Sequence, residues 1–385
     1  MASLVCPDLF DRHHRLWVLG TCCKESATSA KMPGMHVPDG FLDVPTSIAT
    51  GVVAAGALGI SLRRANREIH ESGPALAGLI AAFIFAVQMV NFPVGAGTSG
   101  HLLGGALAAA LVGPWTGVLC MAVVLLVQGL LFADGGLTAL GTNILDMGLA
   151  TVFVGFVLTV ALLRVLPQRK GSVGPAVGIA AFLSVPAAAV VFTALYAVGG
   201  AVSVPLNQLA TAMIGWHLLI GIGEGLISVA VVGAVMASRP DLIYVARHLR
   251  PDLMLVDIDG TPTTTVAPDQ PTAVKASRGP FGLALLTTLV AAAAVSFFAS
   301  AHPDGLEFVG EKLGIAEYAR ESAVAGGPLA DYGIHGITNS AVSGGLAGVI
   351  GVLVTLALFF GAATLVRRRR DATTHEAGQP SRVDA

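Results

Sequence analysis

The chain has 385 residues, of which 54% are hydrophobic and only 12% are charged. Soluble globular domains carry about 25% charged residues, so this composition excludes an ordinary soluble protein and indicates a polytopic membrane protein of the all-α class. The net charge of −2 decides little, because the distribution of charge along a membrane protein matters more than its sum. The four cysteines form no CxxC pair, and we predict neither a disulfide framework nor a thiolate metal site.

Residues 1–34 differ in character from the rest of the chain. They contain three of the cysteines together with charged residues and histidines, and they lack the apolar run that a signal peptide needs. We interpret them as the product of a start codon assigned too far upstream, which makes Met35 the true first residue. A genuine cytosolic or cleaved extension is the alternative.

Apolar segments long enough to cross a bilayer, which takes about 17–25 residues, recur along the chain. We place spans near 46–62, 74–91, 145–166, 174–199, 208–237, 281–300 and 343–366. A further apolar stretch, 102–133, would be about 48 Å long as one helix, which is too long for one span and short for two. Gly113-Pro114 interrupts it, so we predict two short helices there and nine crossings in total.

These segments form two blocks. We predict a seven-helix permease bundle over residues 35–238 and a two-helix module over residues 281–370, with an external loop at 301–342. The polar linker between them, 239–280, has a turn-like middle that we expect to be mobile. The polar tail, 371–385, is expected to be disordered.

Basic residues are distributed unevenly between the predicted loops. With Met35 outside, the cytoplasmic segments hold fifteen Lys and Arg residues, and the external segments hold two, Lys312 and Arg320. Cytoplasmic loops are rich in Lys and Arg, so we predict a multi-pass protein of a bacterial-type plasma membrane with its C-terminus in the cytoplasm. This count requires 102–133 to cross the bilayer twice or not at all.

The stretch Met35-His36-Val37-Pro38-Asp39-Gly40 lies directly before the first span, on the predicted external face. If Met35 is the first residue, its amine, the His36 amide nitrogen and the His36 imidazole can form a chelate of two fused rings around one ion. The loop ending at His101 lies on the same face, and its imidazole can complete four nitrogens in a plane. Such a tetragonal set suits Ni²⁺ or Cu²⁺ and can accept Co²⁺. The alternative is that His36 and His101 are unrelated loop histidines.

Strongly polar side chains lie in or beside the apolar segments, where they are costly unless they face a protein interior. They are Gln88, Asn91, Gln128, Asp134, Asn143, Asp146, His217 and Glu224. His217 and Glu224 lie two helical turns apart on one face, and we favour a buried hydrogen-bond network over a gate or a coupling element.

Two loops are candidates for closing over a bound metal. One carries Asn91, Ser99 and His101, and the other is the Gly-rich loop between Asp134 and Asn143, which could supply hydrogen-bond partners for His101.

The first span carries the small residues Gly51, Ala55 and Gly59 at intervals of four. Such a stripe lets helix backbones approach closely. It either packs inside the bundle or forms a docking face for a partner in the membrane.

Several long strings resemble the CbiM/NikM permeases, the substrate-binding components of energy-coupling-factor transporters for cobalt and nickel. Besides Met35 to Leu42, they are Gly97-Thr-Ser-Gly-His101-Leu-Leu-Gly-Gly105, Gln128-Gly-Leu-Leu-Phe-Ala-Asp134-Gly-Gly-Leu-Thr-Ala-Leu-Gly-Thr-Asn143 and His217-Leu-Leu-Ile-Gly-Ile-Gly-Glu224-Gly. The resemblance covers 35–238 and implies metal ligands at Met35, His36 and His101. The family's chain begins at the residue matching Met35, so a retained 1–34 segment would remove the amine ligand.

A second resemblance lies in the C-terminal block. His302-Pro-Asp-Gly-Leu-Glu307 resembles the PDGLE domain, a two-helix accessory module that implies a role in metal loading. The external loop is rich in acidic residues, which could concentrate cations or simply keep the loop soluble. His302 and His335 are further candidates for transient contact with the metal.

The resemblance implies an uptake subunit rather than an enzyme, with Co²⁺ or Ni²⁺ as the transported substrate and no resident cofactor. The sequence has no phosphate loop of the GxxxxGK[ST] type, so ATP hydrolysis is expected in two ATPase subunits or a homodimeric ATPase. They would act through a transmembrane coupling protein, and no nucleic-acid partner is expected. In transporters of this class a small-residue face on the first helix docks the coupling protein, so the resemblance favours a docking face at Gly51, Ala55 and Gly59. We favour cobalt import for cobalamin biosynthesis.

Three alternatives stay open. The first is a nickel-specific importer of the same type, and the second is a divalent-metal carrier that works without ATPases. The third and most remote is an intramembrane serine protease, in which Ser99 of Gly97-Thr98-Ser99-Gly100 is the nucleophile and His217 the base.

Overall fold

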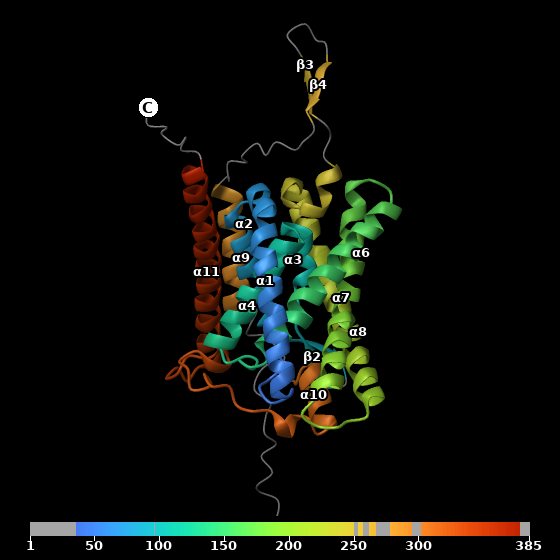
Figure 1. Cartoon of the computed structure of the whole chain (residues 1–385), viewed down its shortest axis with the longest axis vertical. Coiled ribbons are helices and arrows are strands. Elements are labelled where there is room, and N and C mark those ends of the chain that lie inside the picture. The colour runs from blue at the N-terminus through green and yellow to red at the C-terminus, as the bar shows by residue number, and fades with distance from the viewer. Residues whose placement is uncertain are drawn as a thin grey trace, which may run out of the picture. The chain divides into compact units, whose positions relative to one another are not determined.

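The computed structural model describes residues 36–95, 97–249, 253–256, 262–266, 278–294 and 302–377. Helices dominate this part of the chain (Figure 1), and the all-α class is confirmed for it except in two antiparallel hairpins. β1 (Phe92–Gly95) pairs with β2 (Thr98–Gly100), and β3 (Leu253–Val256) pairs with β4 (Pro262–Val266). The second hairpin lies in the segment that we predicted as a mobile linker, whose central residues 257–261 fall outside the described residues.

Helix α1 (Val44–Ser72) begins where Asp43 accepts a hydrogen bond from the Thr46 amide at 2.9 Å, which satisfies a free donor of the first turn. It continues ten residues beyond the predicted span 46–62. Helix α2 (Pro74–Gln88) follows after a single residue, Gly73, whose φ of +82° suits glycine. We call the end of the bundle at which α1 begins the His36 end.

Helices α3 (Gly105–Val112) and α4 (Pro114–Leu131) meet at the predicted Gly113-Pro114 break. At the far end from His36, Glu68 of α1 accepts hydrogen bonds from two backbone amides in the first turn of α4. After α4 the chain is again beside His36, through Asp134. Residues 101–133 therefore leave the His36 end and return to it, which is the double crossing that the charge count requires.

Helix α3 has only eight residues and is about 12 Å long, too short to cross a bilayer alone. The extended residues 101–104 complete this crossing. All of α3 is buried, as irregular backbone at membrane depth must be.

The remaining crossings of the N-terminal block are long. Helix α5 (Leu140–Asn143), a π-helical stretch (Ile144–Ala150) and α6 (Thr151–Val165) form one continuous segment. Helices α7 (Val173–Gly199) and α8 (Leu206–Ser238) follow and pack against each other. A π-helical turn often marks a functional position, and this one begins directly after Asn143.

The C-terminal block contributes α9 (Arg278–Ala294), the short helix α10 (Gly305–Lys312) and α11 (Ser340–Ala377). Helices α9 and α11 pack against α2; a Cβ on Gly78 of α2, for example, would lie 3.2 Å from Leu356. Helix α10 was not predicted, and α11 continues seven residues into the tail that we expected to be disordered from residue 371.

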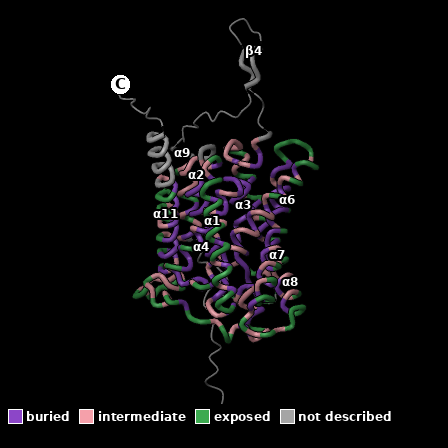
Figure 2. Tube along the Cα trace, in the orientation of Figure 1, coloured by how far each residue is buried: buried purple, intermediate pink, exposed green. Residues whose placement is uncertain are grey.

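Six segments of the described chain are long and apolar enough to cross a membrane, which shows a multi-pass membrane protein. Helices α2 and α9 are shorter apolar helices, and α3 is shorter still. Burial is uneven among the six segments (Figure 2): 67% of the spanning window of α4 is buried and only 22% of that of α1.

Candidate metal-binding site

The segment that follows His36 is fixed by the loop between α4 and α5. The Asn143 side chain accepts a hydrogen bond from the Val37 amide at 3.0 Å and donates one to the Val37 carbonyl oxygen at 3.2 Å. The Asp39 carboxylate accepts from the amides of Leu137 and Thr138. A Cβ on Gly136 would lie 2.2 Å from the Asp39 nitrogen, so this loop needs glycine there.

His36 is buried, and its Nδ1 atom lies 2.9 Å from Oδ1 of Asp134. The other oxygen of Asp134 accepts a hydrogen bond from the Tyr332 hydroxyl at 2.5 Å. Burial lowers the pKa of the imidazole, but the charge and hydrogen bond of Asp134 outweigh it, and the pKa of His36 is raised. Nδ1 is the atom that the predicted chelate needs, and here it faces a carboxylate. The buried Nε2 has no hydrogen-bond partner among the described residues.

The His101 imidazole lies beside that of His36, with ring centres 5.5 Å apart and planes at 67°. Its Nδ1 lies 3.0 Å from the Leu102 carbonyl oxygen; in the tautomer with the proton on Nδ1, the ring donates a hydrogen bond to that oxygen, and the lone pair of Nε2 can bind a metal. The neutral ring is the form that binds metal. Two such rings can share one ion, since a metal lies about 2 Å from each ligating nitrogen.

The backbone after His101 is held by two polar side chains from other helices. Glu224 of α8 accepts hydrogen bonds from the amides of Leu103 at 2.6 Å and Gly104 at 2.9 Å. Gln88 of α2 donates to the Leu103 carbonyl oxygen at 2.7 Å. These contacts replace the helical hydrogen bonds that an extended segment lacks, so they position His101 indirectly.

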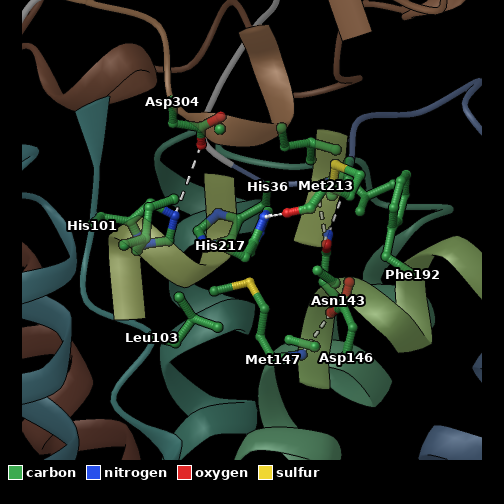
Figure 3. A pocket seen from close by; sticks show the side chains of 16 residues that line it. His36, His101, Leu103, Asn143, Asp146, Met147, Phe192, Met213, His217 and Asp304 are labelled. Carbon is green, nitrogen blue, oxygen red and sulfur yellow. Dashed lines mark hydrogen bonds and ion pairs between the residues drawn. The ribbon is translucent and has the colours of Figure 1, made fainter. Parts of the chain in front are cut away.

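Beneath the two rings is a cavity of about 50 Å³ (Figure 3). A water molecule needs about 10–15 Å³ of such volume, so an ion with a few small ligands fits. The cavity is lined by His36, His101, His217, Asn143, Asp146 and Asp304, with apolar residues between them. Within the described ranges, no three His, Cys, Asp or Glu side chains are already grouped to hold an ion, so binding requires a local adjustment or a donor from Met35, which lies outside those ranges.

Two sequence-based assignments need correction. Asp134 and Asn143 contact His36 and Val37 rather than His101. His217 and Glu224 do not form one network: the His217 Nδ1 lies 2.7 Å from the Met213 carbonyl oxygen, and its ring lines the cavity. Helical spacing correctly placed both residues on one face of α8. Each side chain nevertheless contacts a different segment, because different parts of the chain pack along that face.

Ser99 contacts the C-terminal block instead of the cavity. Its hydroxyl donates to the His302 carbonyl oxygen at 2.7 Å, and its amide donates to the Pro303 carbonyl oxygen at 2.8 Å. A serine nucleophile needs a base within hydrogen-bond reach, so this hydroxyl has the wrong partner for a protease.

The other predicted residues do not line the cavity. Asn91 directly precedes β1, and the Gln128 side chain lies beside Tyr332. Gly51, Ala55 and Gly59 lie on α1 outside the cavity lining. His302 and His335 are exposed.

Sequence reasoning missed Asp304 and Tyr332, two polar side chains that the C-terminal block brings to the site, where Leu306 also lines the cavity. Asp304 belongs to the Pro303-Asp304-Gly305-Leu306-Glu307 string that was noted, so that motif was a usable signal. Tyr332 carries no local signal in the sequence.

The chain matches the CbiM family, described as the cobalt uptake substrate-specific transmembrane region, over residues 36–242, and the PDGLE domain over residues 278–368. A protein of Archaeoglobus fulgidus, provisionally named a fused nickel transport protein, NikMN, is 32% identical over 329 residues, which cover 85% of this chain and 97% of that protein.

Two shorter relatives align with the N-terminal block. A provisionally named metal transport protein of Haloquadratum walsbyi is 36% identical over 224 residues, covering 57% of this chain and all of that protein. The cobalt transport protein CbiM of Sorangium cellulosum is 33% identical over 217 residues, covering 54% of this chain and 94% of that protein.

These matches confirm the resemblance that the sequence strings indicated. The family is a transporter membrane component and is not itself catalytic. The chain belongs to the CbiM family of cobalt and nickel transport proteins and carries a PDGLE domain behind its transmembrane region.

Proposed function

We propose that this protein is the substrate-binding subunit of an ATP-driven energy-coupling-factor transporter that imports Co²⁺ or Ni²⁺. The observation that carries the proposal is the pair His36 and His101, 65 positions apart in the sequence, whose buried rings lie 5.5 Å apart beside a cavity. Two buried imidazoles with Nε2 free in each have few structural roles, whereas imidazole is a preferred ligand of borderline divalent ions.

Binding exchanges protons for metal. Imidazole, amine and amide nitrogens must lose their protons before they ligate an ion. The predicted chelate through Met35 uses the His36 Nδ1, so this atom must first leave Asp134. The Asp134 carboxylate can then accept the proton that the ring loses. Asp134 and Tyr332 thus define the resting position of His36.

The proposed orientation places the His36 end outside. In Figure 1, helices α1, α6, α8 and α11 all end on the opposite side of the bundle. The basic residues that follow the middle of these helices are Arg63, Arg64, Arg67, Arg164, Arg239 and Arg367 to Arg370. Cytoplasmic ends are rich in such residues, so an outward-facing metal site and import follow together.

The proposed docking surface for the coupling protein is the face of α1 that holds Gly51, Ala55 and Gly59. Positions 55 and 59 are exposed, and a Cβ built on Gly51 or Gly59 meets no other atom within 4 Å. Close approach of a second helix to such a face is favourable in a membrane. Two ATPase subunits, or a homodimeric ATPase, would drive transport through that coupling protein.

Cobalt is the substrate that we favour, with cobalamin biosynthesis as its use, and nickel is the alternative. The relatives include both a cobalt and a nickel transport protein. The two ions accept the same donors, so geometry and supply decide between them. Competition of Ni²⁺ against radioactive ⁵⁷Co²⁺ for the purified protein measures the preference directly.

The central test is metal binding by the purified protein and uptake by cells. His36→Ala and His101→Ala are each expected to abolish high-affinity binding, because each removes a donor. Thr142→Ala is the control, since it removes a buried side-chain hydrogen bond to Thr50 of α1 without removing a nitrogen donor. Survival of binding in both cavity variants would disprove the site. Uptake that persists in cells without the partner ATPases would favour the carrier alternative.

The start site decides whether an amine can take part. Intact-mass measurement of the purified protein distinguishes a chain that begins at Met35 from one that begins at Met1. A mature chain that begins at Met1 leaves the two imidazoles in place but removes the amine from the proposed ligand set.

A further inference from the structure

We propose that Asp304 of the PDGLE domain is a further metal-binding residue, which supplies a carboxylate oxygen to the ion held by His36 and His101. This inference rests on the proposed function, because it concerns the same cavity. It adds a donor from the C-terminal domain to a site otherwise built by the transmembrane region.

The first supporting observation is the position of the turn that carries Asp304. Residues 302 and 303 are joined to β2 by the two Ser99 hydrogen bonds. Helix α10 packs on α8, where the rings of Phe308 and Trp216 meet edge to face with centres 5.0 Å apart. The turn is therefore anchored from two sides at the edge of the cavity, and its carboxylate points into it (Figure 3).

The second observation is the distance to His101. Oδ2 of Asp304 lies 3.9 Å from Nε2 of His101, too far for a hydrogen bond. A metal with nitrogen and oxygen ligands at about 2 Å from the ion holds those ligand atoms about 3–4 Å from each other. The separation matches two donors on one ion better than it matches a direct contact.

The third observation is the charge environment. The Asp304 carboxylate is only 4% exposed, and His101 is the only basic group within 4 Å of it among the described residues. Its other oxygen, Oδ1, accepts the Glu307 amide at 2.8 Å and caps α10. A buried carboxylate without a full counter-charge is costly, and a divalent ion would supply that charge. With the His36 Nδ1 held by Asp134, the buried Nε2 of that ring has no described partner and is the atom that can donate to the ion; in a chelate through Met35 the donor would be Nδ1 instead.

After the local adjustment that binding requires, the two imidazoles and one carboxylate would form a mixed nitrogen and oxygen donor set. Such a set suits borderline divalent ions such as Co²⁺, Ni²⁺ or Zn²⁺. Because the carboxylate comes from the PDGLE domain, a bound ion would also link that domain to the transmembrane region.

The test uses the full-length protein in detergent, titrated with Co²⁺ alone. Asp304→Asn and Asp304→Ser both keep a side-chain acceptor that can cap α10, and both remove the carboxylate. We expect each to weaken Co²⁺ binding about 10-fold or more and to change the visible absorption of bound Co²⁺, which reports its ligands. Glu311→Gln removes an exposed negative charge from the same helix and should change neither measurement.

The outcomes are distinguishable from failure of the proposed function. Unchanged affinity and spectrum in both Asp304 variants, with binding still lost in His101→Ala, would overturn the role of Asp304 and leave the histidine site intact. Persistent binding in His36→Ala and His101→Ala would instead remove the proposed site itself. An equal loss in Glu311→Gln would show that net charge, rather than ligation, attracts the ion.

Discussion

The chain crosses from the His36 end in two contrasting ways, by α1 and by residues 101–112. Helix α1 is a continuous helix of 29 residues, and most of its spanning window faces outward. Residues 101–112 combine an extended segment with the buried α3. A continuous helix satisfies its own backbone hydrogen bonds, whereas the broken crossing depends on Gln88 and Glu224. His101 therefore lies on the crossing whose backbone hydrogen bonds depend on other helices, whereas His36 lies just before the continuous helix.

We expect the largest effect from a change of Glu224, which holds the backbone of the extended segment. Glu224→Ala leaves the amides of Leu103 and Gly104 without acceptors, at about 1–3 kcal/mol for each buried group. We expect a large loss of thermal stability in detergent and loss of metal binding, with a smaller loss in Glu224→Gln, which keeps one acceptor oxygen.

Ser228→Ala is the control for that experiment. Ser228 lies one turn further along α8, is buried, and its hydroxyl has no partner among the described residues. If Glu224→Ala melted and bound metal like Ser228→Ala, the extended segment would not depend on this carboxylate.

A smaller loss of metal affinity is expected from a change of Asn143, which holds the segment beside His36. Asn143→Ala removes both side-chain hydrogen bonds to Val37 and loosens the segment that carries His36. Loss of such a supporting contact weakens metal affinity about 10–100-fold, measurable by equilibrium dialysis with Co²⁺. Thr142→Ala also removes a buried hydrogen bond, but to Thr50 of α1, and should preserve affinity. Equal losses in the two variants would assign the effect to general loosening of the bundle.

The sequence predicted the parts of this site that local chemistry specifies. Gly113-Pro114 ends α3 because proline cannot continue a helix and glycine permits its φ of +96° there. The positions of His36 and His101 on one face followed from the order of the crossings and the charge count. Hydrophobic length located these apolar segments, but it did not show that α2, α3 and α9 are shorter than a full span or that α3 is wholly buried.

The contacts that hold the site were harder to predict. Asp134 meets His36 across 98 positions of sequence, and Tyr332 meets Asp134 across 198. No periodicity connects such positions, because they depend on how the C-terminal block packs against the loop after α4. The Glu224 contact is similar: its acceptor role follows from an extended backbone that a run of apolar residues does not reveal.

Acidity offers a finer test, because the two crossings differ in titratable groups. The segment of α1 from Val44 to Leu62 has no titratable side chain, so pH should change metal binding through the groups that line the cavity. The pKa of His36 is raised by Asp134, so as the pH falls the ring is protonated earlier than a free imidazole of pKa about 6.5. Each proton displaced by the metal then costs about 10-fold in affinity per pH unit.

Asp134→Asn sharpens that test. Without the carboxylate the pKa of His36 should fall, and the acid midpoint of Co²⁺ binding should move to lower pH than in the unaltered protein. A midpoint that stays in place would show that another group controls the loss of binding.

The smallest effect on metal binding is expected from substitutions in α1. There we expect metal binding to stay normal while uptake falls. Ala55→Leu and Gly59→Leu place bulky side chains on a face that contacts nothing in the described chain at Gly59. Stability and Co²⁺ affinity of the purified protein should therefore stay close to normal. Uptake driven by the ATPases should fall strongly, because a second helix can no longer approach that face closely.

Ile60→Leu provides the matched control, since it keeps a large apolar side chain at an exposed position of the same helix. Uptake should be normal in that variant. Normal uptake in Ala55→Leu and Gly59→Leu as well would place the coupling surface elsewhere and leave α1 as a lipid-facing helix. Loss of metal binding in Ala55→Leu or Gly59→Leu would contradict the comparison between α1 and residues 101–112, because it would show that the exposed face of α1 also supports the metal site.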